Sequence, residues 1–142
     1  MTTAPVVVKL RGTFRAEVEA GPHQFVMDEP ESAGGTATGP TPYDMLASAL
    51  GGCTGMTLQY YARREKIPLE GVDVTIVHDR QHAKDCADCN SHAGYIHRFT
   101  VSLRLHGPLD AAQRQQLLAI AGRCPVSKTL ASEMRIETVL VD

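Results

Sequence analysis

The chain has 142 residues, of which 43% are hydrophobic and 21% are charged, and its formal net charge is -2. These values suit a single globular domain covering residues 1–142, with a core of its own. A charge this close to neutral, without a basic block, argues against nucleic acid or an anionic membrane as a partner. The N-terminal residues lack signal-peptide features and no apolar run is long enough to cross a bilayer, so we expect a cytoplasmic protein with no membrane partner.

The first part of the chain predicts three strands and a loop. Residues 6–10 and 13–19 are rich in β-branched or alternating residues, and residues 24–27 follow a Gly21-Pro22 turn signal. Glycine and proline then dominate residues 28–42, which predicts a loop.

Residues 43–66 predict a long helix. Its start is marked by Thr41-Pro42, with Asp44 in the first turn, where an acid favours the helix dipole. Residues that recur at helical spacing predict the buried stripe: Leu46, Ala49, Leu50, Cys53, Thr57 and Tyr60. Gly51-Gly52 in mid-helix costs about 1 kcal/mol per glycine relative to alanine, so we expect another element to approach the backbone closely beside Cys53.

The second half predicts two strands, two helices and a last strand. The strands cover residues 71–79 and 95–106, and Asp110 is the expected N-cap of an amphipathic helix over residues 111–121. A helix from Pro125 to about residue 133 and a strand over residues 135–141 complete the order βββ-α-ββ-αα-β. This order defines an α+β fold.

Four cysteines carry the candidate chemistry: Cys53, Cys86, Cys89 and Cys124. In a reducing compartment such cysteines are reactive, metal-binding or simply buried rather than a disulfide framework. Cys53, taken alone, is typical of a small core residue in an apolar helix, although the flanking Gly51-Gly52 also fits a reactive thiol. Pro125 places Cys124 at a helix N-cap, where backbone N–H groups should lower the thiol pKa, although a cysteine before a plain proline turn fits the same residues.

Two segments resemble one family. The segment GPTPYDMLASALGGCTGMTL (residues 39–58) is similar to the proline-led helix and reactive cysteine of the organic-hydroperoxide-resistance/osmotically-induced (Ohr/OsmC) family. The segment LLAIAGRCPVSKTL (residues 117–130) resembles its second, cysteine-proline-valine motif. The resemblance implies an OsmC/Ohr-like fold and an intertwined homodimer with a long central helix.

The resemblance also implies a mechanism. Cys53 would be the peroxidatic cysteine, oxidised by an organic hydroperoxide to a sulfenic acid, and Cys124 the resolving cysteine that condenses with it. An external dithiol would reduce the resulting disulfide, and no cofactor would be required.

Active members of the family carry a glutamate ten residues before the reactive cysteine, and it orders an arginine from the N-terminal strands. Tyr43 occupies that position here, with Asp44 beside it as the substitute. Arg15 is our choice for the arginine over Arg11. The implied catalytic set is therefore Cys53, Cys124, Arg15 and Asp44.

The loop between the two central strands holds His82, Cys86, Cys89 and His92, spaced H-x3-C-x2-C-x2-H. Imidazoles and thiolates are zinc ligands, and C-x2-C is a zinc-knuckle spacing. A redox-active dithiol and a plain solvated loop are the other interpretations. A similar loop occurs in a subgroup of the resembled family.

The main functional prediction is thus cysteine-based reduction of organic hydroperoxides. The first alternative is a redox- or metal-responsive binding protein that uses the Cys86/Cys89 loop, without efficient peroxidase activity. The second is a small-molecule carrier whose apolar pocket does no chemistry.

Overall fold

The computed structural model describes residues 3–141, which divide into two compact units on either side of the Leu46–Ala47 bond. The α+β class predicted from the sequence is confirmed. Because the two units are separate bodies, each is described by itself. The prediction of a single domain stays a prediction.

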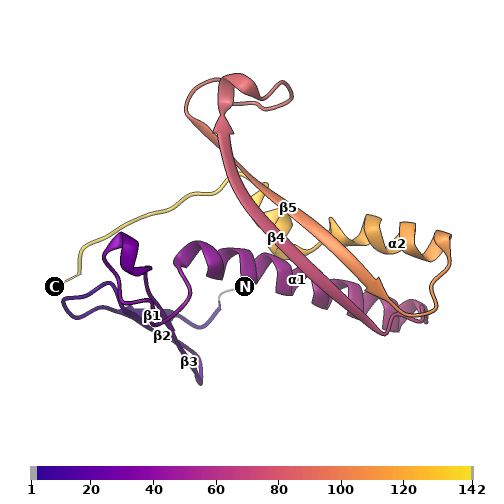
Figure 1. The fold of residues 1–142 in the computed structure, drawn as a ribbon, viewed down its shortest axis with the longest axis horizontal. Coiled ribbons are helices and arrows are strands. Elements are labelled where there is room, and N and C mark those ends of the chain that lie inside the picture. The colour runs from indigo at the N-terminus through magenta and orange to yellow at the C-terminus, as the bar shows by residue number, and fades with distance from the viewer. Residues whose placement is uncertain (1–2, 142) are drawn as a thin grey trace. The chain divides into compact units, whose positions relative to one another are not determined.

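The first unit contains an antiparallel sheet in the order β1-β2-β3 (Figure 1). Its strands are β1 (Val6–Lys9), β2 (Ala16–Ala20) and β3 (His23–Met27). All three were predicted, but β2 begins three residues later than expected. Arg11 and Arg15 therefore lie in the connection between β1 and β2, and not on the strands from which the arginine was expected.

The glycine-rich segment after β3 is a loop, as predicted, with a short 3₁₀ turn over Glu31–Ala33. Asp28 organises it from a buried position, because its carboxylate accepts hydrogen bonds from the hydroxyl and backbone N–H groups of Thr36 and Thr38. The hydroxyl bonds from Thr38 and Thr36 hold the pKa of Asp28 far below its ordinary value. This acid has a structural task in the loop.

Helix α1 (Pro42–Glu65) confirms the predicted long helix. Its start is a reciprocal cap: the Asp44 N–H donates to the Thr41 hydroxyl at 3.1 Å, and the Thr41 N–H donates to Asp44 Oδ2 at 3.0 Å. The buried stripe is offset from the predicted one and consists of Leu50, Thr54, Leu58 and Ala62. The sequence pattern missed the offset because Thr54 is polar and Ala62 is small, whereas Tyr60 was assigned to the buried stripe and is exposed.

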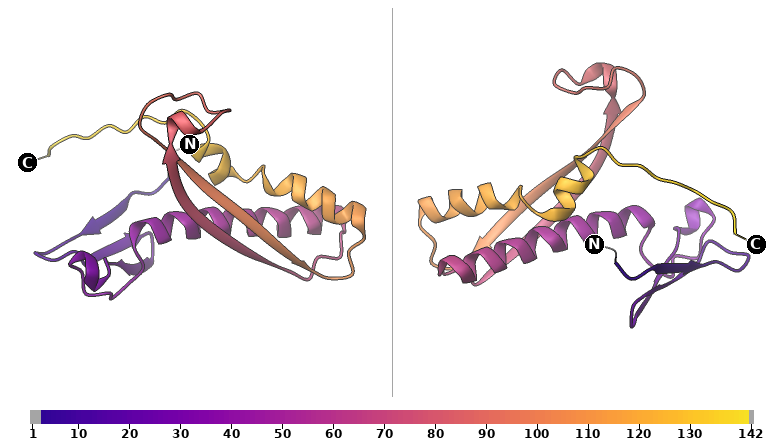
Figure 2. Two further views of the ribbon diagram at one scale, coloured as in Figure 1. Left: turned by 45° about the horizontal axis from the view of Figure 1, so that its top comes forward. Right: turned by 180° about the vertical axis from the view of Figure 1, so that it is seen from behind.

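In the second unit, α1 lies along a long antiparallel hairpin of β4 (Gly71–His82) and β5 (Tyr95–His106) (Figures 1 and 2). β5 has the predicted bounds, and β4 continues three residues beyond its predicted end, so that His82 pairs with Tyr95. The closed end of the hairpin, coloured rose in the figures, projects beyond the helices. It carries the cysteine-containing loop, with a 3₁₀ turn over Ala83–Asp85.

Helix α2 (Ala111–Ala121) has its predicted bounds, and Asp110 forms a full capping box with Gln113. Helix α3 (Pro125–Leu130) is shorter than expected. The predicted strand over residues 135–141 is not formed, and that segment is extended coil. A strand needs a partner for its backbone N–H and C=O groups, and the described chain provides none for this segment.

The core of the second unit lies where α1, α2 and the open end of the hairpin meet. Leu58, Ala62, Leu117 and Ala121 form its buried centre. Two residues closer to the start of α1, Leu50 and Thr54, are buried as well. So is Cys124, at the N-cap of α3. Among the described residues, no helix combines the length and apolarity needed to span a bilayer.

Candidate thiol site

The structure brings together the two cysteines of the predicted reactive pair. Cys53 lies in the middle of α1 and is half-buried, and Cys124 lies at the N-cap of α3 and is fully buried. Both are free thiols, and the Cys53 thiol is one of the groups that lower the pKa of Cys124. Cys53 and Cys124 both belong to the second compact unit, so the pair is formed within one chain.

The N-cap position of Cys124 confirms what Cys124-Pro125 predicted. Proline at the first helical position leaves the next N–H groups free, and the Ser127 N–H donates to Cys124 Sγ at 3.3 Å. Burial raises the pKa of this thiol, but hydrogen bonds from Ser127, Thr54, Cys53 and Val126 outweigh it. The pKa of Cys124 is therefore below its ordinary value, as expected for a thiolate held by several donors.

Thr54 is a component of the site that sequence reasoning did not identify. Its side chain is 1% exposed, and its hydroxyl donates to the Leu50 carbonyl at 2.8 Å and to Cys124 Sγ at 3.7 Å. A hydroxyl has one proton, which these two acceptors share. The available signal was its position four residues after Leu50, on the buried face of α1.

Cys53 opens onto a largely apolar groove of about 670 Å³. Of the residues that the structure describes, Arg123 is the one charged residue in the lining of this groove. The other lining residues are Ser48, Ala49, Gly52, Met56, Thr57, Tyr60 and Pro125. A small apolar molecule fits such a surface, and Cys53 is the sulfur it would meet.

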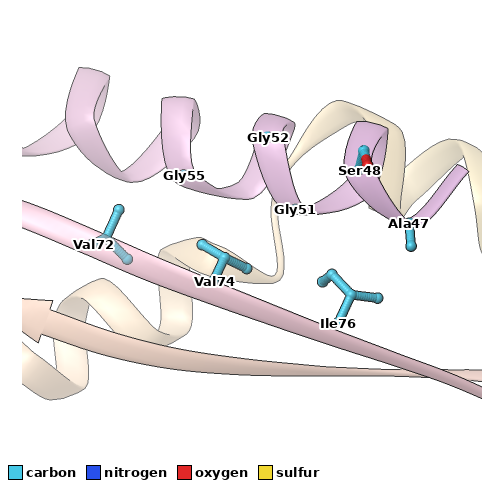
Figure 3. Close-up of a pocket in the computed structure, with 8 residues that line it drawn as sticks. All are labelled: Ala47, Ser48, Gly51, Gly52, Gly55, Val72, Val74 and Ile76. Carbon is cyan, nitrogen blue, oxygen red and sulfur yellow. The ribbon is translucent and has the colours of Figure 1, made fainter. Parts of the chain in front are cut away.

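The glycines of α1 let β4 approach the helix (Figure 3). A Cβ at Gly51 would lie 3.2 Å from Ile76 Cγ1, and one at Gly55 would lie 3.7 Å from Val72 and Val74. The predicted close approach is therefore confirmed at Gly51. At Gly52 the space is open, so this residue thins the wall of the Cys53 groove instead.

Arg15 and Asp44 belong to the first compact unit, where each has a partner of its own. Arg15 forms an exposed ion pair with Glu17 at 2.7 Å, and Asp44 completes the cap of α1. Cys53 lies nine positions after Asp44 in α1, which places the two side chains on opposite faces of the helix. Their catalytic roles stay predictions.

The second cysteine pair forms a disulfide, Cys86–Cys89, at the closed end of the hairpin. Asp88 joins it: the sulfur atoms and the Asp88 carboxylate lie within 4.8 Å of one another. The two histidines of the predicted metal set, His82 and His92, are not part of this cluster. The ring of His82 stacks on Tyr95 instead, with 4.6 Å between the ring centroids.

Comparison with known proteins identifies the chain's relatives. Its fold matches the OsmC-like protein of Mycoplasma pneumoniae with a TM-score of 0.72 at 18% identity, over 91% of this chain and 87% of that one. It matches the organic hydroperoxide resistance protein OsmC of Legionella pneumophila, described as a predicted redox protein, with a TM-score of 0.66 at 20% identity over 92% of each chain.

The organic hydroperoxide resistance protein OhrB of Bacillus subtilis is 26% identical, with a TM-score of 0.57 over 92% of this chain and 91% of that one. No curated protein sequence matches the chain. The family model for OsmC-like proteins matches residues 34–139, which include both cysteine pairs. The chain belongs to the OsmC-like family.

Proposed function

We propose that the protein reduces organic hydroperoxides with the Cys53/Cys124 pair and an external dithiol. The observation that carries this proposal is the difference between the environments of the two sulfur atoms. Cys53 lines an apolar groove, while Cys124 is fully buried and has a pKa that is lowered in part by the Cys53 thiol. Similarity to organic hydroperoxide resistance proteins supports a redox role.

The proposed cycle begins with a proton transfer. The Cys53 thiol gives its proton to the Cys124 thiolate, and the Cys53 thiolate attacks the outer peroxide oxygen. The O–O bond breaks, Cys53 becomes a sulfenic acid, and the alkoxide takes the proton from Cys124 and leaves as the alcohol. The Cys124 thiolate then attacks the Cys53 sulfur, which forms the disulfide and releases hydroxide.

A dithiol closes the cycle by exchange, since it supplies the two electrons that return both cysteines to thiols. The apolar groove favours hydroperoxides with a hydrocarbon body over hydrogen peroxide, because a small polar molecule gains little from apolar walls. We place this reaction in the cytoplasm, where dithiol reductants keep cysteines reduced.

The test is consumption of cumene hydroperoxide with dihydrolipoamide as reductant. We expect turnover by the native protein and loss of at least about a hundredfold in Cys53→Ser, which lacks the nucleophile. A Cys86→Ser/Cys89→Ser chain is the matched control and should retain turnover. Equal activity of Cys53→Ser and the native protein would exclude the proposal and favour a carrier.

We also propose that the protein is a homodimer. The groove face of α1 exposes Met56 at 74% and Tyr60 at 68%, and the C-terminal segment exposes Ile136 at 90% and Leu140 at 95%. Apolar residues this exposed mark a surface that a partner covers. Light scattering should give twice the chain mass, and a monomer at micromolar concentration would rule the dimer out.

A further inference from the structure

The loop that closes the β4–β5 hairpin holds a set of ligand atoms for which the peroxide reaction has no use. The two sulfur atoms of Cys86 and Cys89 and a carboxylate oxygen of Asp88 lie within 4.8 Å of one another. Cys86 Sγ is 3.5 Å from Asp88 Oδ1, and the Cα atoms of the cysteines are 5.5 Å apart. All three groups therefore converge on one small volume.

The backbone just before these groups is anchored to the hairpin. The Ala83 N–H donates to the Gly94 carbonyl at 2.8 Å, which extends the hairpin pairing into the loop, and Ala83 is 2% exposed. The Cys86 N–H donates to the Ala83 carbonyl at 3.1 Å. These bonds fix the chain just before the ligands, so little ordering entropy remains to oppose binding at the loop.

We propose that this loop is a redox-gated zinc site whose ligands are Cys86, Asp88 and Cys89. In the disulfide the sulfur atoms are bonded to each other and hold no metal. A dithiol donates two electrons and two protons, which break the S–S bond and leave two thiols. Zinc binding then displaces both protons and gives two thiolates and one carboxylate around the ion.

The geometry of the loop permits this change. Two sulfur atoms bound to one zinc ion at about 2.3 Å are roughly 3.8 Å apart in a tetrahedral site. Cysteines three residues apart reach that separation by side-chain rotation alone, as they do in zinc knuckles of C-x2-C type. The Cα positions of Cys86 and Cys89 can therefore serve both states.

The ligand set differs from the one that the sequence pattern suggested. His82 belongs to β4 and stacks on Tyr95, whose other contact is the guanidinium of Arg80 at 4.6 Å from the ring centroid. His92 lies outside the cluster. Three protein ligands leave the fourth position to water, which is typical of exchangeable rather than permanently closed sites.

The test is a zinc titration of the full-length protein against a chromophoric chelator. Protein with the disulfide intact and protein reduced anaerobically by a phosphine are compared, both in a Cys53→Ser/Cys124→Ser background that removes the other thiols. We expect one zinc ion per chain in the reduced state and none in the disulfide state. Absence of binding after reduction, or equal binding in both states, overturns the proposal.

Matched variants then identify the ligands. Cys86→Ser/Cys89→Ser should abolish binding, and Asp88→Asn should weaken it about tenfold or more, the loss expected for one altered ligand. Asp85→Asn, in the same loop but outside the cluster, and His92→Ala should bind as the parent does. Circular dichroism confirms that each variant is folded. Binding that survives without the two cysteines, or that is lost with His92, contradicts the assigned ligand set.

Discussion

Two opposing effects act on the sulfur atom of Cys124. Complete burial disfavours a charged thiolate, whereas the Ser127 N–H, the Thr54 hydroxyl and the Cys53 thiol all donate to it. The donors prevail, so the pKa of Cys124 lies below its ordinary value. Cys124 is thus the base of the proposed cycle before it is the resolving cysteine.

Thr54 provides the test of this balance. Thr54→Val removes the hydroxyl with little change of volume, and a hydrogen bond to a charged acceptor contributes about 1.5–3 kcal/mol. At 3.7 Å the bond is long, so we expect the Cys124 thiolate to lose stabilisation at the lower end of that range. The pKa of Cys124 should rise accordingly. Ultraviolet thiolate absorbance, followed in a Cys53→Ser background, should titrate at higher pH.

Thr54→Ser keeps the donor and serves as the control, because its titration should resemble that of the parent. The pKa of Cys124 should rise because the Thr54 hydroxyl stabilises the thiolate form. Without that donor, the thiol keeps its proton to higher pH. An unchanged titration in Thr54→Val, or an equal shift in Thr54→Ser, would show that the hydroxyl does not act on Cys124.

At the residue scale, the sequence predicted what depends on local chemistry. Cys124-Pro125 specifies an N-cap wherever the fold places it, and Asp110 does the same for α2. Thr54 and Asp88 could not be identified in this way. Thr54 acts on Cys124, which lies 70 residues away along the chain, and the place of Asp88 depends on the turn that the Cys86–Cys89 disulfide closes around it.

At the scale of elements, α1 packs on β4 with some of its residues and lines the Cys53 groove with others. Its glycines differ in what they face: Gly51 meets Ile76, while Gly52 meets no heavy atom within 4 Å. The sequence predicted that something approaches this pair closely, but only the structure distinguishes the packed glycine from the open one. Substitutions at these two neighbouring glycines should therefore have opposite effects on the stability of the protein.

Gly51→Val should destabilise the protein by about 1–3 kcal/mol, because its side chain would force β4 away from the helix. Gly52→Ala should instead stabilise it by up to about 1 kcal/mol, since alanine is the better helix former and has room. Urea unfolding at equal protein concentration measures both. Equal midpoints for the two variants would mean that β4 does not pack on Gly51.

The C-terminal segment marks the limit of element prediction from pattern. Residues 135–141 have the composition of a strand, and β1, β3, β4 and β5 were all located by the same signal. Pattern shows that a segment can be a strand, whereas pairing depends on an available edge. The extended coil of this segment, with its exposed Ile136 and Leu140, is what a strand without its partner looks like.

At the scale of the whole molecule, the family and the α+β class followed from motifs around Cys53 and Cys124. Which face of α1 is buried could not be predicted from the sequence, because the groove face is apolar and yet exposed in a single chain. A periodicity analysis assigns every apolar residue of a helix to one core. In this chain some of them lie in its own core and others lie on an exposed surface. The proposed homodimer accounts for that surface.

The molecule carries two cysteine pairs with different settings. Cys53/Cys124 lies within the helical layer beside an apolar groove, and Cys86/Cys89 lies at the projecting end of the hairpin (Figure 1). A hydroperoxide with a hydrocarbon body should therefore oxidise the first pair. The second pair, already a disulfide, should not change.

Mass spectrometry of the protein after a brief stoichiometric pulse of cumene hydroperoxide tests this most directly. Peptide mapping without reduction should then find a Cys53–Cys124 disulfide, with Cys86–Cys89 as before, and Cys124→Ser should stop at the sulfenic acid of Cys53. The account is contradicted if Cys53 and Cys124 both remain thiols while the hydroperoxide is consumed.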